Sequence, residues 1–154
     1  MTNNLGKKFE QSFKESAKKD ELFIIRFNDS NLSYNGNNVS NFTPKNPADF
    51  EIFQTPYLFF LELKHTINTS IGIQRDLTLP DKMIKAHQIN SLTQMSLNKK
   101  CVCGFVLSFL VEKENEEYTY FLDIKDFNRF LITSEKSSIN RTDVILYNGI
   151  QISS

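Results

Sequence analysis

Apolar residues recur along this chain with two different periods, and the period separates predicted helices from predicted strands. From Leu5 to Ala17 they recur every four residues, the spacing of one stripe of an amphipathic helix, so we expect a helix over Leu5–Lys18. Helical spacing also predicts helices over Asp81–Leu97 and Asp123–Leu131.

Short, strongly apolar runs predict strands. The predicted strands are Leu22–Phe27, Asp49–Phe53, Leu58–Lys64, Cys101–Val111 and Glu117–Leu122. The first of these is apolar enough to suggest burial on both faces. Gln54–Tyr57 contains Pro56 and predicts the turn of a hairpin between the second and third strands.

Three segments follow neither period. Residues 28–46 hold seven asparagines with Gly36 and Pro44, and residues 65–80 are polar and irregular. In the tail, Asn148-Gly149 forms either a hairpin turn between Val144–Tyr147 and Ile150–Ile152 or the cap of a short helix.

Together these elements predict one α/β domain over residues 1–154, with a central mixed sheet flanked by helices. Fourteen phenylalanines and no tryptophan indicate a core built largely on phenylalanine. No apolar run approaches the roughly 20 residues of a membrane span, and no apolar stretch follows the first lysines, so we expect a cytoplasmic protein. Cys101 and Cys103 are read as small buried apolar residues, the alternatives being a partial metal site or a redox pair.

Two charged residues within the third predicted strand need an explanation. Because side chains alternate along a strand, Glu62 and Lys64 share one face, and Leu61 and Leu63 share the other. A hairpin centred between Thr55 and Pro56 places Asp49 opposite Glu62. Two adjacent carboxylates repel each other, and a divalent cation relieves the repulsion. The alternative is an ordinary hairpin in which Glu62 forms a structural salt bridge.

The motifs Pro47-Ala48-Asp49 and Glu62-Leu63-Lys64 resemble the signature of the PD-(D/E)XK nuclease superfamily. Further stretches occur in the order and spacing of one family within it: Gly6–Glu10, Ile84–Ile89, Gly104–Phe109 and Tyr120–Phe127. From about Leu5 to Phe130 the chain is therefore similar to the RecU family of Holliday junction resolvases. The resemblance implies a restriction-endonuclease-like core and a metal-dependent endodeoxyribonuclease that resolves four-way junctions by paired nicks.

The resemblance also implies roles for particular residues. Asp49 and Glu62, with the backbone carbonyl of Leu63, would bind Mg²⁺ or Mn²⁺. Lys64 would orient the attacking water or stabilise charge on the phosphate. Aligned positions add Glu10, which would complete the metal environment, and Gln88, which would hold a metal-bound water or the phosphate. Lys85, one turn before Gln88, is a candidate phosphate contact.

Residues 28–46 correspond to a protruding arm that enters the junction in the RecU family. Here Tyr34 and Phe42 are candidates to touch exposed bases, and Lys45 is the basic residue near its end. The alternative is a surface loop. The short arm and compact chain slightly favour a phage-encoded over a cellular bacterial protein.

Branched DNA and a second copy of the chain are the expected partners, because a junction is roughly two-fold symmetric and suits a homodimer. A formal net charge of zero counts against a nucleic-acid partner. The charge is uneven, however: residues 1–110 carry 13 basic and 10 acidic residues, and residues 111–154 carry 5 and 8. Two alternatives remain: another restriction or repair nuclease of the superfamily, or a non-catalytic DNA-binding protein with this fold.

Overall fold

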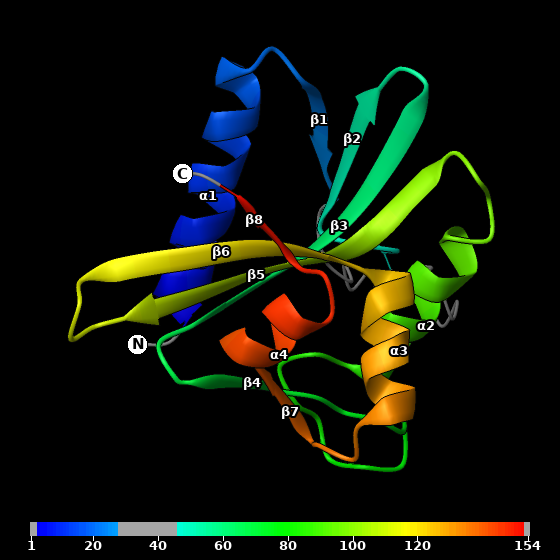
Figure 1. Ribbon diagram of the computed structural model, residues 1–154. Coiled ribbons are helices and arrows are strands. Elements are labelled where there is room, and N and C mark those ends of the chain that lie inside the picture. The colour runs from blue at the N-terminus through cyan, green and yellow to red at the C-terminus, as the bar shows by residue number, and fades with distance from the viewer. Residues whose placement is uncertain (1–2, 28–45, 153–154) are drawn as a thin grey trace, which may run out of the picture.

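The computed structural model describes residues 3–27 and 46–152, in which a six-stranded mixed sheet is flanked by helices (Figure 1). The sheet has the order β1-β2-β3-β5-β6-β8, and only β3 and β5 pair in parallel. Its strands are β1 (Phe23–Arg26), β2 (Phe50–Gln54), β3 (Tyr57–Thr66), β5 (Cys101–Val111), β6 (Glu116–Asp123) and β8 (Ile150–Ile152). Strands β4 (Ser70–Gly72) and β7 (Ser138–Asn140) form a second, two-stranded sheet. The helices are α1 (Asn3–Lys19), α2 (Ala86–Met95), α3 (Ile124–Thr133) and α4 (Arg141–Leu146).

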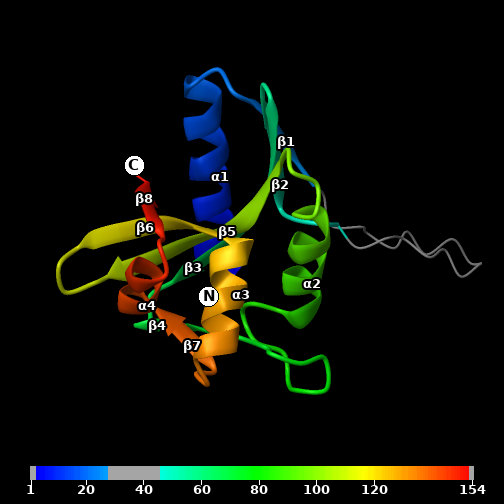
Figure 2. The same ribbon diagram turned by 45° about the vertical axis from the view of Figure 1, so that its right-hand side comes forward.

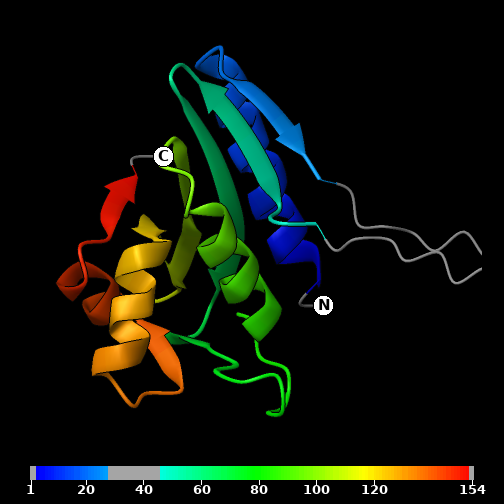
Figure 3. The ribbon, with the colours of Figure 1, turned by 90° about the vertical axis from the view of Figure 1, so that its right-hand side faces the viewer.

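Helix α1 covers one face of the β1–β3 part of the sheet, and α2 and α3 lie on the other side (Figures 2 and 3). On the α1 side, Leu61 and Leu63 of β3 pack with Phe50 of β2 and with Phe9 and Phe13 of the helix. The predicted alternation of β3 is thus confirmed, since the leucines point to α1 and leave Glu62 and Lys64 for the side of α2.

The larger core lies between the sheet and helices α2 and α3. Its fully buried members include four phenylalanines, Phe105, Phe109, Phe127 and Phe130. The prediction of a phenylalanine-rich core is confirmed. No helix within residues 3–27 and 46–152 combines the length and apolarity that crossing a bilayer requires.

Two predictions about single elements are wrong. Strand β1 is not buried on both faces, because it lies at the sheet edge with α1 on one face only, and Phe23 and Ile25 of the other face are 63% and 42% exposed. Helix α2 begins at Ala86 rather than Asp81. The preceding residues are extended instead, since Ile84 forms a bridge with Ile73 next to β4.

The tail contains the short helix rather than the hairpin. Helix α4 ends at Leu146, Asn148 adopts a left-handed φ of 67°, and the Gly149 amide donates to the Val144 carbonyl over 2.7 Å. A residue in this conformation just after a helix reverses the chain direction. The reversal allows Ile150–Ile152 to pair with β6.

Candidate active site

The β2–β3 hairpin positions two carboxylates next to each other. Its register pairs Phe50 with Leu61, so Asp49 precedes the first paired residue and lies across from Glu62. The Asp49 amide donates to the Leu61 carbonyl over 3.1 Å, and Asp49 Oδ2 accepts from the Leu63 amide over 2.8 Å. The hairpin geometry expected from the sequence is confirmed, including the turn at Thr55–Pro56, which contains a cis peptide bond.

Burial of this pair changes the protonation of Asp49. Its pKa is raised to about 7, first because burial penalises the charged carboxylate and second because the Glu62 carboxylate repels it. The Leu63 amide and the Lys64 ammonium oppose the rise, and Glu10 adds a smaller repulsion. A buried site that holds two carboxylates close together is therefore short of positive charge.

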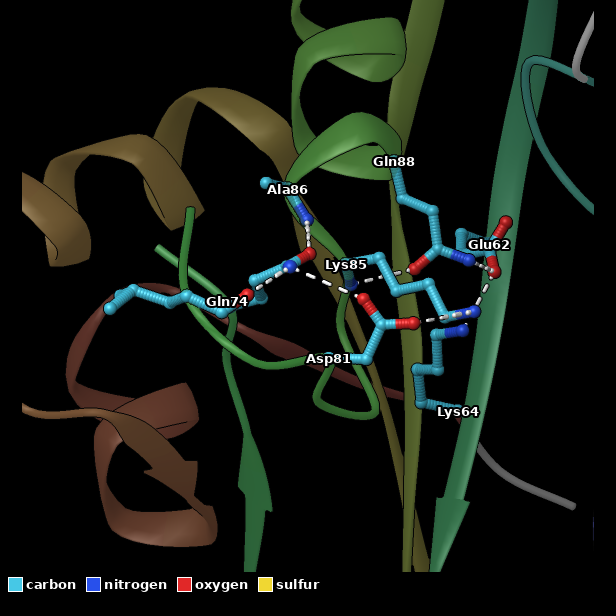
Figure 4. Close-up of polar contacts among 8 residues, drawn as sticks. Glu62, Lys64, Gln74, Asp81, Lys85, Ala86 and Gln88 are labelled. Atoms are coloured by element: carbon cyan, nitrogen blue, oxygen red, sulfur yellow. Dashed lines mark hydrogen bonds and ion pairs between the residues drawn. The ribbon is translucent and has the colours of Figure 1, made fainter. Parts of the chain in front are cut away.

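Glu62 is the centre of the polar contacts on β3 (Figure 4). Its Oε1 accepts from Lys64 Nζ over 2.8 Å and from Gln88 Nε2 over 2.5 Å. Both charged side chains of the β3 pair are well buried, with 5% of the Glu62 and 13% of the Lys64 side chain exposed. The salt bridge considered as a structural alternative is thus present, but it is one part of a larger polar cluster.

The first turn of α2 presents Gln88 to Glu62. The Gln88 side chain uses both of its ends, because its Oε1 accepts from the Lys85 backbone amide over 2.9 Å while its Nε2 donates to Glu62. A backbone amide at a helix N-terminus otherwise lacks an intrahelical partner. Gln88 therefore caps the helix and orients the carboxylate at the same time.

Gln74 is a buried residue that the sequence patterns did not reveal. Its Nε2 donates to the Leu79 carbonyl and to Asp81 Oδ1, and its Oε1 accepts from the Ala86 amide, over 2.8, 3.2 and 2.9 Å (Figure 4). This amide ties the loop before α2 to the residues after β4, and so fixes where the helix begins. Residues 65–80 were predicted to be irregular. The alternation of Ile71 and Ile73, just before Gln74, could have indicated strand β4 there.

Asp81, in the same loop, lies near Lys85. Its Oδ2 is 3.6 Å from Lys85 Nζ, and the Lys85 side chain is 42% exposed. Lys85 is therefore accessible at the site edge, as a phosphate contact requires, but its ammonium lies near a carboxylate.

Glu10 reaches toward the pair from α1. Its Oε2 accepts from Arg26 Nε and Nη2 over 2.9 and 2.7 Å. Arg26, at the end of β1, was not predicted as a site residue, because an arginine ending an apolar strand carries no distinctive pattern. The structure places Glu10 close enough to influence Asp49, while its carboxylate is bonded to Arg26.

Three of the predicted DNA contacts fall outside the described residues: Tyr34, Phe42 and Lys45. His65, which follows Lys64 on β3, lies on the α1 face, where its Nδ1 is 3.0 Å from Ser108 Oγ and its ring lies 5.5 Å from that of Phe9.

The donor set fits a hard divalent cation. Within the described part of the chain, no three His, Cys, Asp or Glu side chains converge as a ready ligand set. Asp49, Glu62 and the Leu63 carbonyl offer oxygen donors, however, and a cation would relieve the burial and repulsion that raise the pKa of Asp49. Magnesium retains several waters and needs few protein ligands, so two carboxylates and a carbonyl suffice.

Comparison with known proteins supports this fold independently. Over 95% of both chains, the structure superposes on Hjc from Archaeoglobus fulgidus, a Holliday junction resolvase from an archaeal hyperthermophile, with a TM-score of 0.58 and 16% sequence identity. The chain has the fold of this archaeal nuclease. The expected restriction-endonuclease-like core, with a mixed sheet between helices, is thereby confirmed.

At the sequence level, the chain is 35% identical over 136 residues to the SPbeta prophage-derived uncharacterized protein YotM of Bacillus subtilis strain 168. The match covers 87% of this chain but spans 63% of the length of YotM. No family model matches the sequence. The narrower resemblance to RecU stays a prediction.

Proposed function

We propose that the protein is a metal-dependent endodeoxyribonuclease that resolves four-way DNA junctions by paired nicks. The observation that carries the proposal is the grouping of Asp49, Glu62, Lys64 and Gln88 on one side of the sheet. The fold supports it, since Hjc, a structural neighbour, is itself a Holliday junction resolvase. The repulsion between Asp49 and the buried Glu62 costs folding free energy, and a metal-dependent reaction gives a reason for that cost which a non-catalytic protein lacks.

In this proposal the carboxylates of Asp49 and Glu62 hold Mg²⁺ or Mn²⁺ with the Leu63 carbonyl. The bound ion would lower the pKa of water and offset negative charge at the scissile phosphate. The Leu63 amide fixes one oxygen of Asp49, and Gln88 fixes one oxygen of Glu62. Both carboxylates are thus oriented before a ligand arrives, which reduces the cost of reorganisation during the reaction.

Lys64 supplies positive charge to the phosphate. Its Nζ donates to Glu62 Oε1, so the ammonium lies beside a proposed metal ligand. A phosphate bound to the metal ion would therefore lie next to Lys64. Lys64 stabilises the charge that develops on the phosphate oxygens and orients the attacking water.

Selection of a four-way junction requires features beyond this site. We propose that junction selectivity comes from a homodimer, whose two sites would cut symmetry-related strands, and from the arm at residues 28–46. The described flanks of that segment support the second assignment. The Phe27 amide donates to the Asp49 carbonyl over 2.9 Å, so the chain leaves β1 and returns to β2 beside the carboxylate pair.

The test compares four-way, three-way and linear duplex DNA of matched sequence, each with Mg²⁺, Mn²⁺, Ca²⁺ or excess chelator. We expect paired nicks near the branch point with Mg²⁺ or Mn²⁺ and binding without efficient cutting with Ca²⁺, which tolerates looser geometry. Equal cutting of linear duplex would favour a restriction or repair nuclease. Full activity in chelator would rule out the metal mechanism.

A further inference from the structure

A cleft of about 720 Å³ continues from the candidate site past the end of β3. Its walls are the N-terminal end of α1, the last residues of β3 and the loop before α2, and Leu63, Lys64 and Glu10 lie on its border with the site. The volume is within the range of about 300–1,000 Å³ that is typical of small-ligand sites. Because Lys64 belongs to both the cleft and the candidate site, a nucleotide in the cleft would lie next to a phosphate held at Lys64.

Lysines on two walls of the cleft are available to a ligand. Lys7 of α1 and Lys82 of the loop are exposed, and neither takes part in an ion pair among the described residues. The acids of the cleft, in contrast, are engaged: Glu10 bonds Arg26, and Asp81 contacts Gln74 and Lys85. The cleft therefore has uncompensated positive charge.

The stem of Lys82 lies against the small two-stranded sheet. A Cβ added to Gly72 would lie 3.4 Å from Lys82 Cδ, so the lysine stem runs across this glycine. The neighbouring Ile84 amide donates to the Gly72 carbonyl over 3.0 Å. The backbone two residues after Lys82 is thus tied to β4, while the Lys82 side chain itself is exposed.

The same cleft exposes aliphatic side chains. Leu5, Ile67 and Met83 line it and are 38%, 45% and 41% exposed. Lysines alone would bind the phosphates of any nucleic acid. The aliphatic surface beside them, in contrast, can cover the flat face of a base only if that face is not already stacked on a neighbouring base. Leucine, isoleucine and methionine are residues that proteins insert against unstacked base steps.

We propose that this cleft binds one unstacked nucleotide next to the scissile phosphate, with its phosphate between Lys7 and Lys82 and its base on Leu5, Ile67 and Met83. The proposal rests on the proposed nuclease function and deepens it. Removing a base from the stack costs a few kcal/mol in intact duplex and less where pairing or stacking is already disturbed, as at a branch point. The cleft therefore favours cutting beside a branch point within each subunit.

The test is equilibrium binding to a four-way junction in Ca²⁺ at several salt concentrations, with 2-aminopurine placed in turn at each position around the branch point. Wild type should increase the fluorescence at one position, because the probe brightens on unstacking. The double variant Lys7→Gln/Lys82→Gln should lower the slope of log affinity against log salt by about two, one for each lost phosphate contact. The double variant Ile67→Ser/Met83→Ser should keep that slope and lose the fluorescence change.

The matched control is Lys8→Gln, an exposed lysine of α1 that does not line the cleft. Its slope should stay within about half a unit of wild type, by the same counting of phosphate contacts. The cleft proposal is overturned if the Lys7→Gln/Lys82→Gln slope equals that of wild type, or if Lys8→Gln lowers the slope equally. It is also overturned if no probe position responds to wild type.

The proposed function fails separately. If the Lys7→Gln/Lys82→Gln variant lowers the salt slope as expected but the wild-type protein cuts no junction in Mg²⁺, the nuclease function is refuted and the proposed nucleotide binding in the cleft stands. A wild-type protein that binds no branched DNA would overturn both.

Discussion

Gln88 Nε2 donates to Glu62 Oε1 over 2.5 Å, which joins the first turn of α2 to the middle of β3. The same amide accepts from the Lys85 backbone through its oxygen, so the position of the helix and the orientation of the carboxylate are set together. The candidate metal ligand is thus held by the helix that connects the two parallel strands.

This relationship predicts the effect of replacing Gln88. Gln88→Ala should lower single-turnover junction cleavage about 10- to 100-fold and shift the Mg²⁺ dependence to higher concentration, as is typical when a partner of a metal ligand is lost. Asn90→Ala, which changes an exposed residue of the same helix, is the control. Unchanged Mg²⁺ dependence in Gln88→Ala would show that the amide serves the helix alone.

Removal of the charged trio should separate binding from cutting. Asp49→Asn and Glu62→Gln should abolish cleavage, and Lys64→Ala should lower its rate by about a hundredfold or more, the scale of a positioned charge-stabilising group. Junction affinity in Ca²⁺ should persist for Lys64→Ala within an order of magnitude. Glu51→Gln, two residues from Asp49 on β2, is the matched control. Cleavage at the wild-type rate by any trio variant would contradict the nuclease assignment.

The raised pKa of Asp49 predicts a pH dependence of stability in metal-free protein. Because the folded-state pKa of about 7 exceeds the ordinary value of 3.8, its stabilising contribution is complete below about pH 4 and is lost as the pH rises toward 7. The Tm of Asp49→Asn relative to wild type should therefore increase from pH 4 to pH 7 and then level off. Thermal melts in chelator measure it, and saturating Mg²⁺ should reduce the difference at pH 8. A Tm difference that is constant with pH would show that Asp49 titrates normally.

Gln74 should prove more important for stability than its polar surroundings suggest. Gln74→Ala removes three hydrogen bonds of a residue that is 4% exposed, and we expect a loss of about 2–3 kcal/mol in the free energy of unfolding. Urea denaturation measures the loss, and hydrogen exchange should show faster opening at the Ala86 amide. Gln54→Ala, at an exposed position in β2, should change stability by less than about 0.5 kcal/mol. Equal effects of the two variants would contradict the inference that the Gln74 amide stabilises the loop before α2.

The arm hypothesis concerns residues 28–46, most of which the structure does not describe. Replacement of residues 31–41 by a short Gly-Ser turn should leave the fold and metal site intact and remove the preference for four-way over linear DNA. Competition binding with matched DNA measures this preference, and the melting temperature checks the fold. If the shortened protein selects junctions as strongly as wild type, the segment is a loop and the selectivity lies elsewhere.

The β3 part of the site was predictable because it depends on local geometry. Alternation along one strand places Glu62 and Lys64 together, and a symmetric turn places Asp49 across from them. Gln88 came from resemblance, since no local rule brings a helix 26 residues away to a particular strand position.

Gln74 and Arg26 were not predictable, because their importance depends on tertiary contacts. A glutamine in a polar segment looks like a loop residue until its amide is seen to bond Leu79, Asp81 and Ala86. The start of α2 was missed for the same reason. Helical spacing continued back to Asp81, but pairing of Ile84 with Ile73 competes with helix formation there.

The parallel pairing of β3 with β5 also affects how the site assembles during folding. The β2–β3 hairpin closes a loop of only a few residues, so the two carboxylates meet early and at little entropic cost. Gln88 reaches Glu62 only after the long crossover through β4 and α2 has been closed. We therefore expect a newly synthesised chain to bring its acidic pair together before Gln88 can orient it, so that competence for chemistry is among the last properties the fold acquires.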